Sequence, residues 1–578
     1  MPRQHDAKIE AASSDHVETI NTDDHYQRNS TGVDASDLAG YWTSPRLLGS
    51  LAATVLMANS LFFGVAMPVN IISIIDADIG PSDSAYLVPF IYQLFYGALH
   101  LFVARLSDIV GRRFFLSMGQ ILAVIGFAVC ARANTIDTLI AGSAIAGVGG
   151  AASLLFPVII HELIPNKHRP FGQAMILASV IPSVGFGPVI ARAMVVHTAA
   201  GWRSIYWLQV GICAASALLY LACYFPPTFY AINSELSKWQ EVKMLDYGGL
   251  FLYVAGLIVL LLGFTWAQGS YAWKSSHVIT SLILGALLLV AFGLYELFVP
   301  LKQPLLPTKL FKIPNFTACL FIGSTMQMIW IVQSVFWPIQ ITTLFTTDQI
   351  QIGLLSCTTG AGLAAGELVF SPLYRYLGRV RWQLVLASAM TVAFSAALAA
   401  VTSQGRGMGI AFTTLAGLAV GWIELITIVT VGLVAPPNDI GVAQGLFSSV
   451  RQVFGIIAVS IYLAVYKSQL STRLPRYVAT AAEAAGLPPT SLTSLLTAVE
   501  NGTVAALQAV PGISESITEA VALGSRQAST ESLRTVYLAT LAFTGVGLAA
   551  AFFIKEVDSL LTDYVNKTIR KPGMKQPV

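Results

Sequence analysis

Charged side chains are scarce in this sequence. Asp, Glu, Lys and Arg make up 11% of its 578 residues, whereas a soluble globular domain carries roughly 25%. Hydrophobic residues make up 55%, and the mean hydropathy is +0.69. This composition indicates a polytopic membrane protein. The net charge of +3 is small and spread over many short polar segments, so no nucleic-acid-binding surface is indicated.

Cysteine is rare, and motifs for metals and nucleotides are missing. The five cysteines lie in or beside apolar runs without metal or disulfide spacing, which is typical of small core residues. The chain has no G-x-x-x-x-G-K-[ST] loop, so we expect an ion gradient rather than ATP to supply energy. It also has no Ser/His or His/Asp/Glu cluster at one membrane face. We therefore expect no metal, no cofactor and no enzymatic activity.

Long apolar runs fill most of the chain. A helix needs roughly 20 such residues to cross a bilayer, and about fourteen runs qualify. We expect an all-α integral membrane protein with spans at 47–72, 85–104, 114–132, 138–160, 171–195, 204–225, 248–267, 278–299, 315–340, 352–373, 382–401, 408–434, 442–466 and 533–554.

Lys and Arg are distributed unequally between the connecting segments. With the N-terminus inside, the inner segments hold Arg105, Arg112, Arg113, Lys167, Arg169, Lys238, Lys243, Lys302, Lys309, Lys312, Arg375, Arg379 and Arg381. The outer segments hold far fewer, chiefly Arg132, Arg203, Lys274 and Arg406. Because cations beside spans are retained in the cytoplasm, both termini are expected there. We predict a multi-pass plasma-membrane protein, with the vacuolar or a vesicle membrane as alternatives.

This orientation predicts how the polar segments are exposed. Residues 1–46 are polar and lack the apolar stretch of a signal peptide, so we expect a disordered cytoplasmic tail. Residues 555–578 form the second cytoplasmic tail. The long segment 467–532 is expected to be an extracellular loop, which makes Asn501 the one sequon residue available for glycosylation. The sequons at Asn29, Asn315 and Asn566 would face the cytosol.

A short polar stretch, LSDIVGRR from Leu106 to Arg113, separates the second and third runs. Its L-x-x-x-x-G-R skeleton returns 267 positions later in residues 373–381, with Arg375 in place of Asp108. The stretch resembles the G-x-L-[SA]-D-x-x-G-R-R loop of major facilitator superfamily transporters. This resemblance implies two similar halves related by an axis along the membrane normal. It also implies an inner gate formed by Asp108, Gly111, Arg112, Arg113, Gly378 and Arg379; a solvated loop of positive charge is the alternative.

Two further stretches narrow the resemblance. Residues 246–279 are similar to the linking spans of fourteen-helix drug:H+ antiporters, and residues 421–455 to fungal trichothecene efflux pumps and related siderophore transporters. We therefore expect an N-terminal six-helix half at 47–225, two linking helices within 226–312, and a C-terminal six-helix half at 313–554. In the fifth span, Gly185, Gly187 and Pro188 resemble the antiporter signature and predict a kink; tight packing alone is the alternative.

Four ionisable residues are predicted at membrane depth, where an ionisable group costs about 2.5–3.5 kcal/mol on insertion scales. His100 and Glu367 occupy equivalent positions in the two repeats, and Glu424 and Arg451 lie on consecutive antiparallel spans close enough to pair. Many of the transporters that this chain resembles have an arginine credited with proton transfer at the position of Ser143. Because this chain has serine there, another residue must carry the proton. Glu424 with Arg451 is our first candidate and Glu367 the second. A packing histidine, a helix-end carboxylate and a static ion pair are the alternatives.

Amide and aromatic side chains in the spans could form an amphipathic substrate cavity. The candidates are Gln93, Gln209, Gln327, Gln333, Trp330 and Trp422. We expect export of a toxin, drug or fungal secondary metabolite in exchange for protons. Ferric-siderophore uptake and a non-transporting nutrient receptor are the alternatives. The predicted partners are a small organic substrate, protons and the lipid bilayer, without nucleic acid or ATP.

Overall fold

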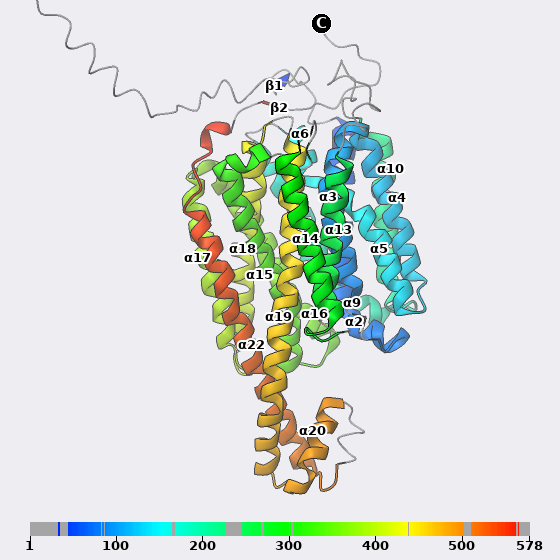
Figure 1. Cartoon of the computed structure of the whole chain (residues 1–578), viewed down its shortest axis with the longest axis vertical. Helices are drawn as coiled ribbons and strands as arrows, with labels where there is room; N and C mark the ends of the chain where they lie inside the picture. The colour runs from blue at the N-terminus through cyan, green and yellow to red at the C-terminus, as the bar shows by residue number, and fades with distance from the viewer. Residues whose placement is uncertain are drawn as a thin grey trace, which may run out of the picture.

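The computed structural model describes residues 33–34, 44–82, 84–85, 87–164, 168–225, 246–267, 271–299, 301, 304, 306, 308–436, 439–501, 510–561 and 564–565. The predicted disorder of the first tail therefore falls largely outside the described residues. Within them, β1 (Val33–Asp34) pairs antiparallel with β2 (Tyr564–Val565). The segments next to the two termini thus meet at one end of the molecule, which we call the tail side (Figure 1).

Helices dominate the described chain, which confirms the predicted all-α class. The first half contains α2 (Pro45–Ile79), α3 (Leu87–Val110), α4 (Arg112–Ala131), α5 (Ile136–Ser153), α6 (Phe156–Leu163), α7 (Arg169–Ser179), α8 (Ile181–Val184), α9 (Gly187–His197) and α10 (Arg203–Cys223). The linking pair is α13 (Tyr247–Trp266) and α14 (Ser276–Phe298). The second half contains α15 (Pro314–Leu344), α16 (Gln349–Tyr376), α17 (Val380–Ala397), α18 (Arg406–Val434), α19 (Ile440–Ala484), α20 (Leu492–Asn501) and α22 (Glu515–Ala551).

Thirteen helical segments among the described residues are long and apolar enough to cross a membrane. They overlap thirteen of the fourteen predicted spans. Several begin where a side chain caps the first turn: Thr135 for α5, Ser275 for α14 and Asp348 for α16 each accept a hydrogen bond from a backbone amide. Such caps satisfy amides that have no partner within the helix.

The remaining predicted span, 171–195, is broken into α7, α8 and α9. Each piece has a proline in its first turn, Pro170, Pro182 and Pro188 respectively. Proline lacks an amide hydrogen and its ring clashes with the preceding turn, so a helix restarts at it readily. The break at Gly185 and Phe186, just before α9, lies within the predicted kink. The continuous helix predicted here is therefore corrected to three short ones.

The two halves pack side by side along two seams. Helix α3 of the first half lies along α19 of the second, and α7, α8 and α9 lie along α16. The hairpin of α13 and α14 packs against α3 and α19 through α13 (Figure 1). The buried core continues across both halves. Any movement of one half against the other must therefore occur at these two seams.

Residues 467–532, which the sequence predicts to be an extracellular loop, are largely helical where the structure describes them. Helix α19 has 45 residues, about 68 Å at 1.5 Å per residue, which is far longer than a bilayer core of about 30 Å. Its end, the 3-10 turn η7 (Pro489–Ser491), α20 and the start of α22 form a small helical projection opposite the tail side (Figure 1). A separate core holds it together, made of Val478, Ala482, Leu487, Leu495, Ala498, Val510, Ile517 and Val521. We call this end the projection side.

Candidate functional site

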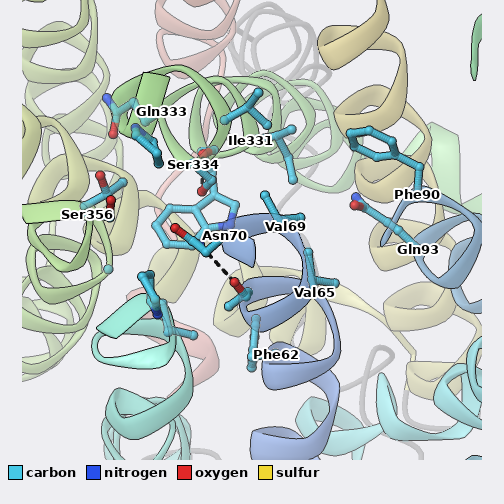
Figure 2. A pocket seen from close by; sticks show the side chains of 18 residues that line it. Phe62, Val65, Val69, Asn70, Phe90, Gln93, Ile331, Gln333, Ser334 and Ser356 are labelled. Carbon is cyan, nitrogen blue, oxygen red and sulfur yellow. Dashed lines mark hydrogen bonds between the residues drawn. The ribbon is translucent and has the colours of Figure 1, made fainter. Parts of the chain in front are cut away.

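A cavity lies between the two halves and consists of two adjoining hollows. Both are walled by Phe62, Val65, Gln93, Val184, Trp330 and Ile331. The first, which we call the projection-side hollow, also contacts Asn70, Gln333, Ser334 and Ser356 (Figure 2). The second, the central hollow, contacts Glu424 and Arg451.

Four of the six predicted cavity residues line these hollows: Gln93, Gln327, Gln333 and Trp330. Gln93 on α3 also joins the two halves at the cavity wall, because its Nε2 donates to Oε1 of Gln452 on α19 at 3.0 Å. The amide and hydroxyl groups lie among Val, Ile and Phe side chains (Figure 2). Such a wall suits a ligand that is mostly apolar and carries a few polar groups.

The other two candidates, Gln209 and Trp422, do not line either hollow. Gln209 on α10 is buried inside the first half, where its Nε2 donates to the backbone oxygen of Ser60 at 3.2 Å. Trp422 stacks flat on Phe370, with 3.8 Å between ring centroids, and its Nε1 donates to Gln383 at 3.3 Å. Neither residue is among those that wall the two hollows. Both side chains contact neighbouring helices of their own half, because they lie on helix faces that point away from the interface between the halves.

A buried ion pair lies at the central hollow. Arg451 Nη2 donates to Glu424 Oε1 at 2.8 Å and to Gln327 Oε1 at 3.0 Å, and the guanidinium lies over the Phe447 ring at 5.2 Å. The side chains of Arg451 and Glu424 are 6% and 12% exposed. The pairing that the sequence made possible is thus present. It leaves the cavity wall here close to electrically neutral.

Glu367 on α16 is a second buried acid beside this pair. It is fully buried and interacts electrostatically with Glu424 and Arg451. Neither of its carboxyl oxygens has a hydrogen-bond partner among the described residues. The site thus places two acids near one cation in a dry environment, where a single positive charge can neutralise only one carboxylate.

His100, the repeat-equivalent of Glu367, has different surroundings. It is fully buried on α3, and its Nδ1 lies 2.8 Å from the backbone oxygen of Ala151 on α5. Its Nε2 has no hydrogen-bond partner in the described part of the chain. His100 therefore faces the packing between two helices of the first half. Its predicted part in proton handling stays a prediction.

The predicted inner gate lies on the tail side. Arg112 begins α4 after Gly111, which has a φ of 121°, and forms an ion pair with Glu162 of α6 at 2.9 Å. Arg113 donates to the backbone oxygen of Leu221, and its guanidinium lies 3.9 Å from the Phe225 ring centroid. The side chain of Asp108 lies outside the described residues. Its pairing with an arginine therefore stays a prediction.

The second copy of the motif makes a left-handed turn. Gly378 and Arg379 have φ values of 55° and 51°, a region that glycine adopts most easily. The backbone amide of Arg379 donates to Asp558 Oδ2 at 3.3 Å, and Gln383 Nε2 donates to the Gly378 oxygen at 2.7 Å. This copy lacks an acid at position 375, and an acid from the C-terminal segment supports the turn instead.

Sequence reasoning missed a buried contact that joins the two halves on the tail side. Arg169 was predicted in an inner loop, but it is 2% exposed in α7. Its Nη1 donates to the Gly432 oxygen of α18 at 3.1 Å, and its Nη2 to the His161 oxygen at 2.7 Å. A Cβ on Gly432 would lie 2.3 Å from the His161 ring. The sequence signal for this contact was the pair His161 and Glu162 before Pro165, with Arg169 four residues after that proline.

Comparison with known proteins agrees with this architecture. The model of the fungal trichothecene efflux pump (TRI12) family matches residues 14–575. The trichothecene efflux pump TRI12 of Fusarium sporotrichioides is 27% identical over 94% of this chain and 92% of its own. The MFS-type transporter prx5 of Penicillium rubens is 30% identical over 77% of this chain and 81% of its own.

Solved structures share the fold at low sequence identity. The human organic anion transporter MFSD10 has a TM-score of 0.51 and 12% identity, covering 87% of this chain and 100% of that one. The proton:xylose symporter XylE has the same TM-score and identity over 90% of this chain and 98% of that one. With a family match over nearly its full length, the chain belongs to the fungal trichothecene efflux pump family of major facilitator superfamily transporters.

Proposed function

We propose that this transporter exports a small, mostly apolar fungal secondary metabolite, such as a toxin, in exchange for protons. The family match and the names of the relatives support the substrate class. The wall of the cavity supports it too, because its acid Glu424 is neutralised by Arg451 and the other polar groups are amides and hydroxyls. A strongly cationic substrate would find no free carboxylate on the described cavity wall.

The fully buried Glu367 supports proton coupling. A carboxyl group without hydrogen-bond donors is more stable as the neutral acid in a dry interior. When the halves separate and water reaches it, the acid can ionise, and Arg451 can then pair with Glu367 instead of Glu424. A proton would thus bind in one conformation and leave in another, which is what coupling to a gradient requires. Glu367 is therefore now the first candidate, ahead of Glu424.

The Glu367→Gln variant tests this proposal because glutamine keeps the size of the side chain and cannot titrate. In proteoliposomes with an imposed pH gradient, we expect substrate accumulation to fall to the level of protein-free vesicles. Substrate binding should remain at the wild-type level, since Glu367 is not among the residues that wall either hollow. The assay uses a trichothecene panel, with ferric siderophore uptake measured in parallel.

The matched control is Glu296→Gln, which changes another buried acid in a membrane helix, on α14, away from the cavity. It should transport like wild type. If Glu424→Gln abolishes accumulation and Glu367→Gln does not, the coupling site is the one the sequence first indicated. If wild-type protein ignores the pH gradient, proton coupling is wrong.

We further propose that both tails lie in the cytosol and the projection lies outside the plasma membrane. The excess of Lys and Arg in the tail-side connections supports this orientation. Asn501 ends α20 in the projection, although its side chain lies outside the described residues. Asn501→Gln should remove all glycosidase-sensitive mobility, whereas Asn566→Gln should leave it unchanged. A shift that persists in Asn501→Gln protein would contradict the orientation.

A further inference from the structure

Arg192 of α9 joins the two halves on the projection side. Its Nη2 donates to the backbone oxygen of Asn70 on α2 at 3.0 Å, and its Nη1 donates to the side-chain oxygen of Gln349 on α16. Helices α2 and α9 belong to the first half, and α16 belongs to the second. The arginine is only 7% exposed. One guanidinium thus ties three helices together across the interface.

This contact lies directly beside the cavity. Asn70 and Pro188 both contact the projection-side hollow (Figure 2 labels Asn70), and Arg192 follows Pro188 by one helical turn on the same face of α9. Gln349 begins α16, about two turns before Ser356 of the hollow. Arg192 therefore lies between the hollow and the projection side.

The two helices approach closely at this point because α16 has a glycine there. A Cβ on Gly353 would lie 3.0 Å from the Val189 Cα and 3.2 Å from the Arg192 Cδ. The stem of Arg192 therefore rests on the bare backbone of α16. This leaves the guanidinium at the right height to reach Gln349, one turn earlier on the same helix.

The ion pairs found among the described residues do not cross the interface between the two halves. Arg451 pairs with Glu424 within the second half, and Arg203 pairs with Asp78 within the first. Arg169 crosses it at the opposite, tail side, through the Gly432 oxygen. Arg192 and Arg169 thus join the two halves at opposite ends of the cavity.

We propose that Arg192 is a latch that closes the cavity on the projection side and must release for the cavity to open there. The proposal rests on the transport function above and makes Arg192 a positioning residue for it. Gln349 suits a contact that opens repeatedly. Its side chain is already exposed to water, so it loses little hydrogen-bonding free energy when it separates from Arg192. After release, water can replace the hydrogen bond that Arg192 donates to Gln349.

Thiol labelling of a cavity residue tests the latch directly. Ser334→Cys places a thiol in the projection-side hollow with little change in size (Figure 2). A membrane-impermeant maleimide is applied to right-side-out and to inside-out membrane vesicles, so both sides are measured. The same protein without Ser334→Cys gives the background of the five native cysteines, four of them buried.

Arg192→Ala in the reporter should raise labelling from the projection side about tenfold, because the hydrogen bond of a charged group across the interface is lost together with the packing of the Arg192 stem on Gly353. Arg192→Lys should give an intermediate rate, since an ammonium group lacks the planar fork that reaches two partners. Gln349→Ala should raise the labelling rate less than Arg192→Ala, because Arg192 stays bound to Asn70 and its stem still packs on Gly353. Arg203→Ala is the matched control: it removes an arginine on the same side whose partner Asp78 lies in its own half, and should label at the wild-type rate.

Wild-type labelling rates in both Arg192→Ala and Gln349→Ala would overturn the proposal. An equal rise from both sides would also overturn it, because it would mean general loosening rather than opening of one side. If Arg192→Ala protein does not fold, Gln349→Ala decides the question. Labelling needs neither substrate nor gradient, so a failed latch leaves the proposed transport intact, and absent wild-type transport leaves the labelling result valid.

Discussion

Arg451→Ala should destabilise the protein by about 3–5 kcal/mol and abolish transport. The substitution leaves the buried carboxylate of Glu424 without its cation, and Gln327 loses a donor. An uncompensated charge in a dry interior is far more costly than the loss of the pair itself, because its solvation is not replaced. The melting temperature of the purified protein in detergent and its transport in proteoliposomes are the measurements.

A double variant separates stability from mechanism. Arg451→Met combined with Glu424→Gln removes both charges and keeps the volume, so the melting temperature should return close to that of wild type. Transport should stay absent, because the cation that the two acids share is gone. Arg534→Ala is the control, since Arg534 and its partner Glu531 form an exposed pair at 3.8 Å that contributes little. Normal stability in Arg451→Ala protein would mean that the pair is not held as described.

Gly360→Leu should abolish transport by preventing the two halves from closing along α8 and α16. A Cβ on Gly360 would lie 1.8 Å from the Val184 oxygen and 2.5 Å from its carbonyl carbon. Both are backbone atoms, so no side-chain rotation relieves the clash. Even Gly360→Ala should reduce transport strongly, because α8 would have to move away from α16. Val184 and Gly360 also wall the projection-side hollow, so the displacement would reach the cavity.

The control for this prediction is Gly293→Ala in α14, where a Cβ would have no atom within 4 Å. Alanine favours a helix over glycine by about 1 kcal/mol, so this variant should be as stable as wild type and fully active. Flux and melting temperature are measured for both. Full activity of Gly360→Ala protein would show that the close approach of α8 and α16 is not needed during transport.

The sequence predicted the membrane class and the positions of the helices, because long apolar runs and the positions of Lys and Arg are local properties that a bilayer constrains strongly. The repeated L-x-x-x-x-G-R motif and the linking stretch at 246–279 indicated the family, and the comparisons confirm it. The break near Gly185 was also readable, since glycine and proline limit helices locally. Pro182 divides the same span further, which the apolar pattern alone did not reveal.

Only the tertiary structure decided which polar residues work together. Gln327 lines the cavity while Gln209 packs inside one half, although both lie in equally apolar helices, because the face a residue occupies depends on how the helices rotate against one another. Arg169 and Arg192 are separated by many residues from Gly432 and Gln349, and contacts across the halves leave no periodic signal in the chain. From the sequence alone the spans and their family therefore follow, whereas the cavity, its buried acids and the two cross-half arginines follow only from the packing of one half on the other.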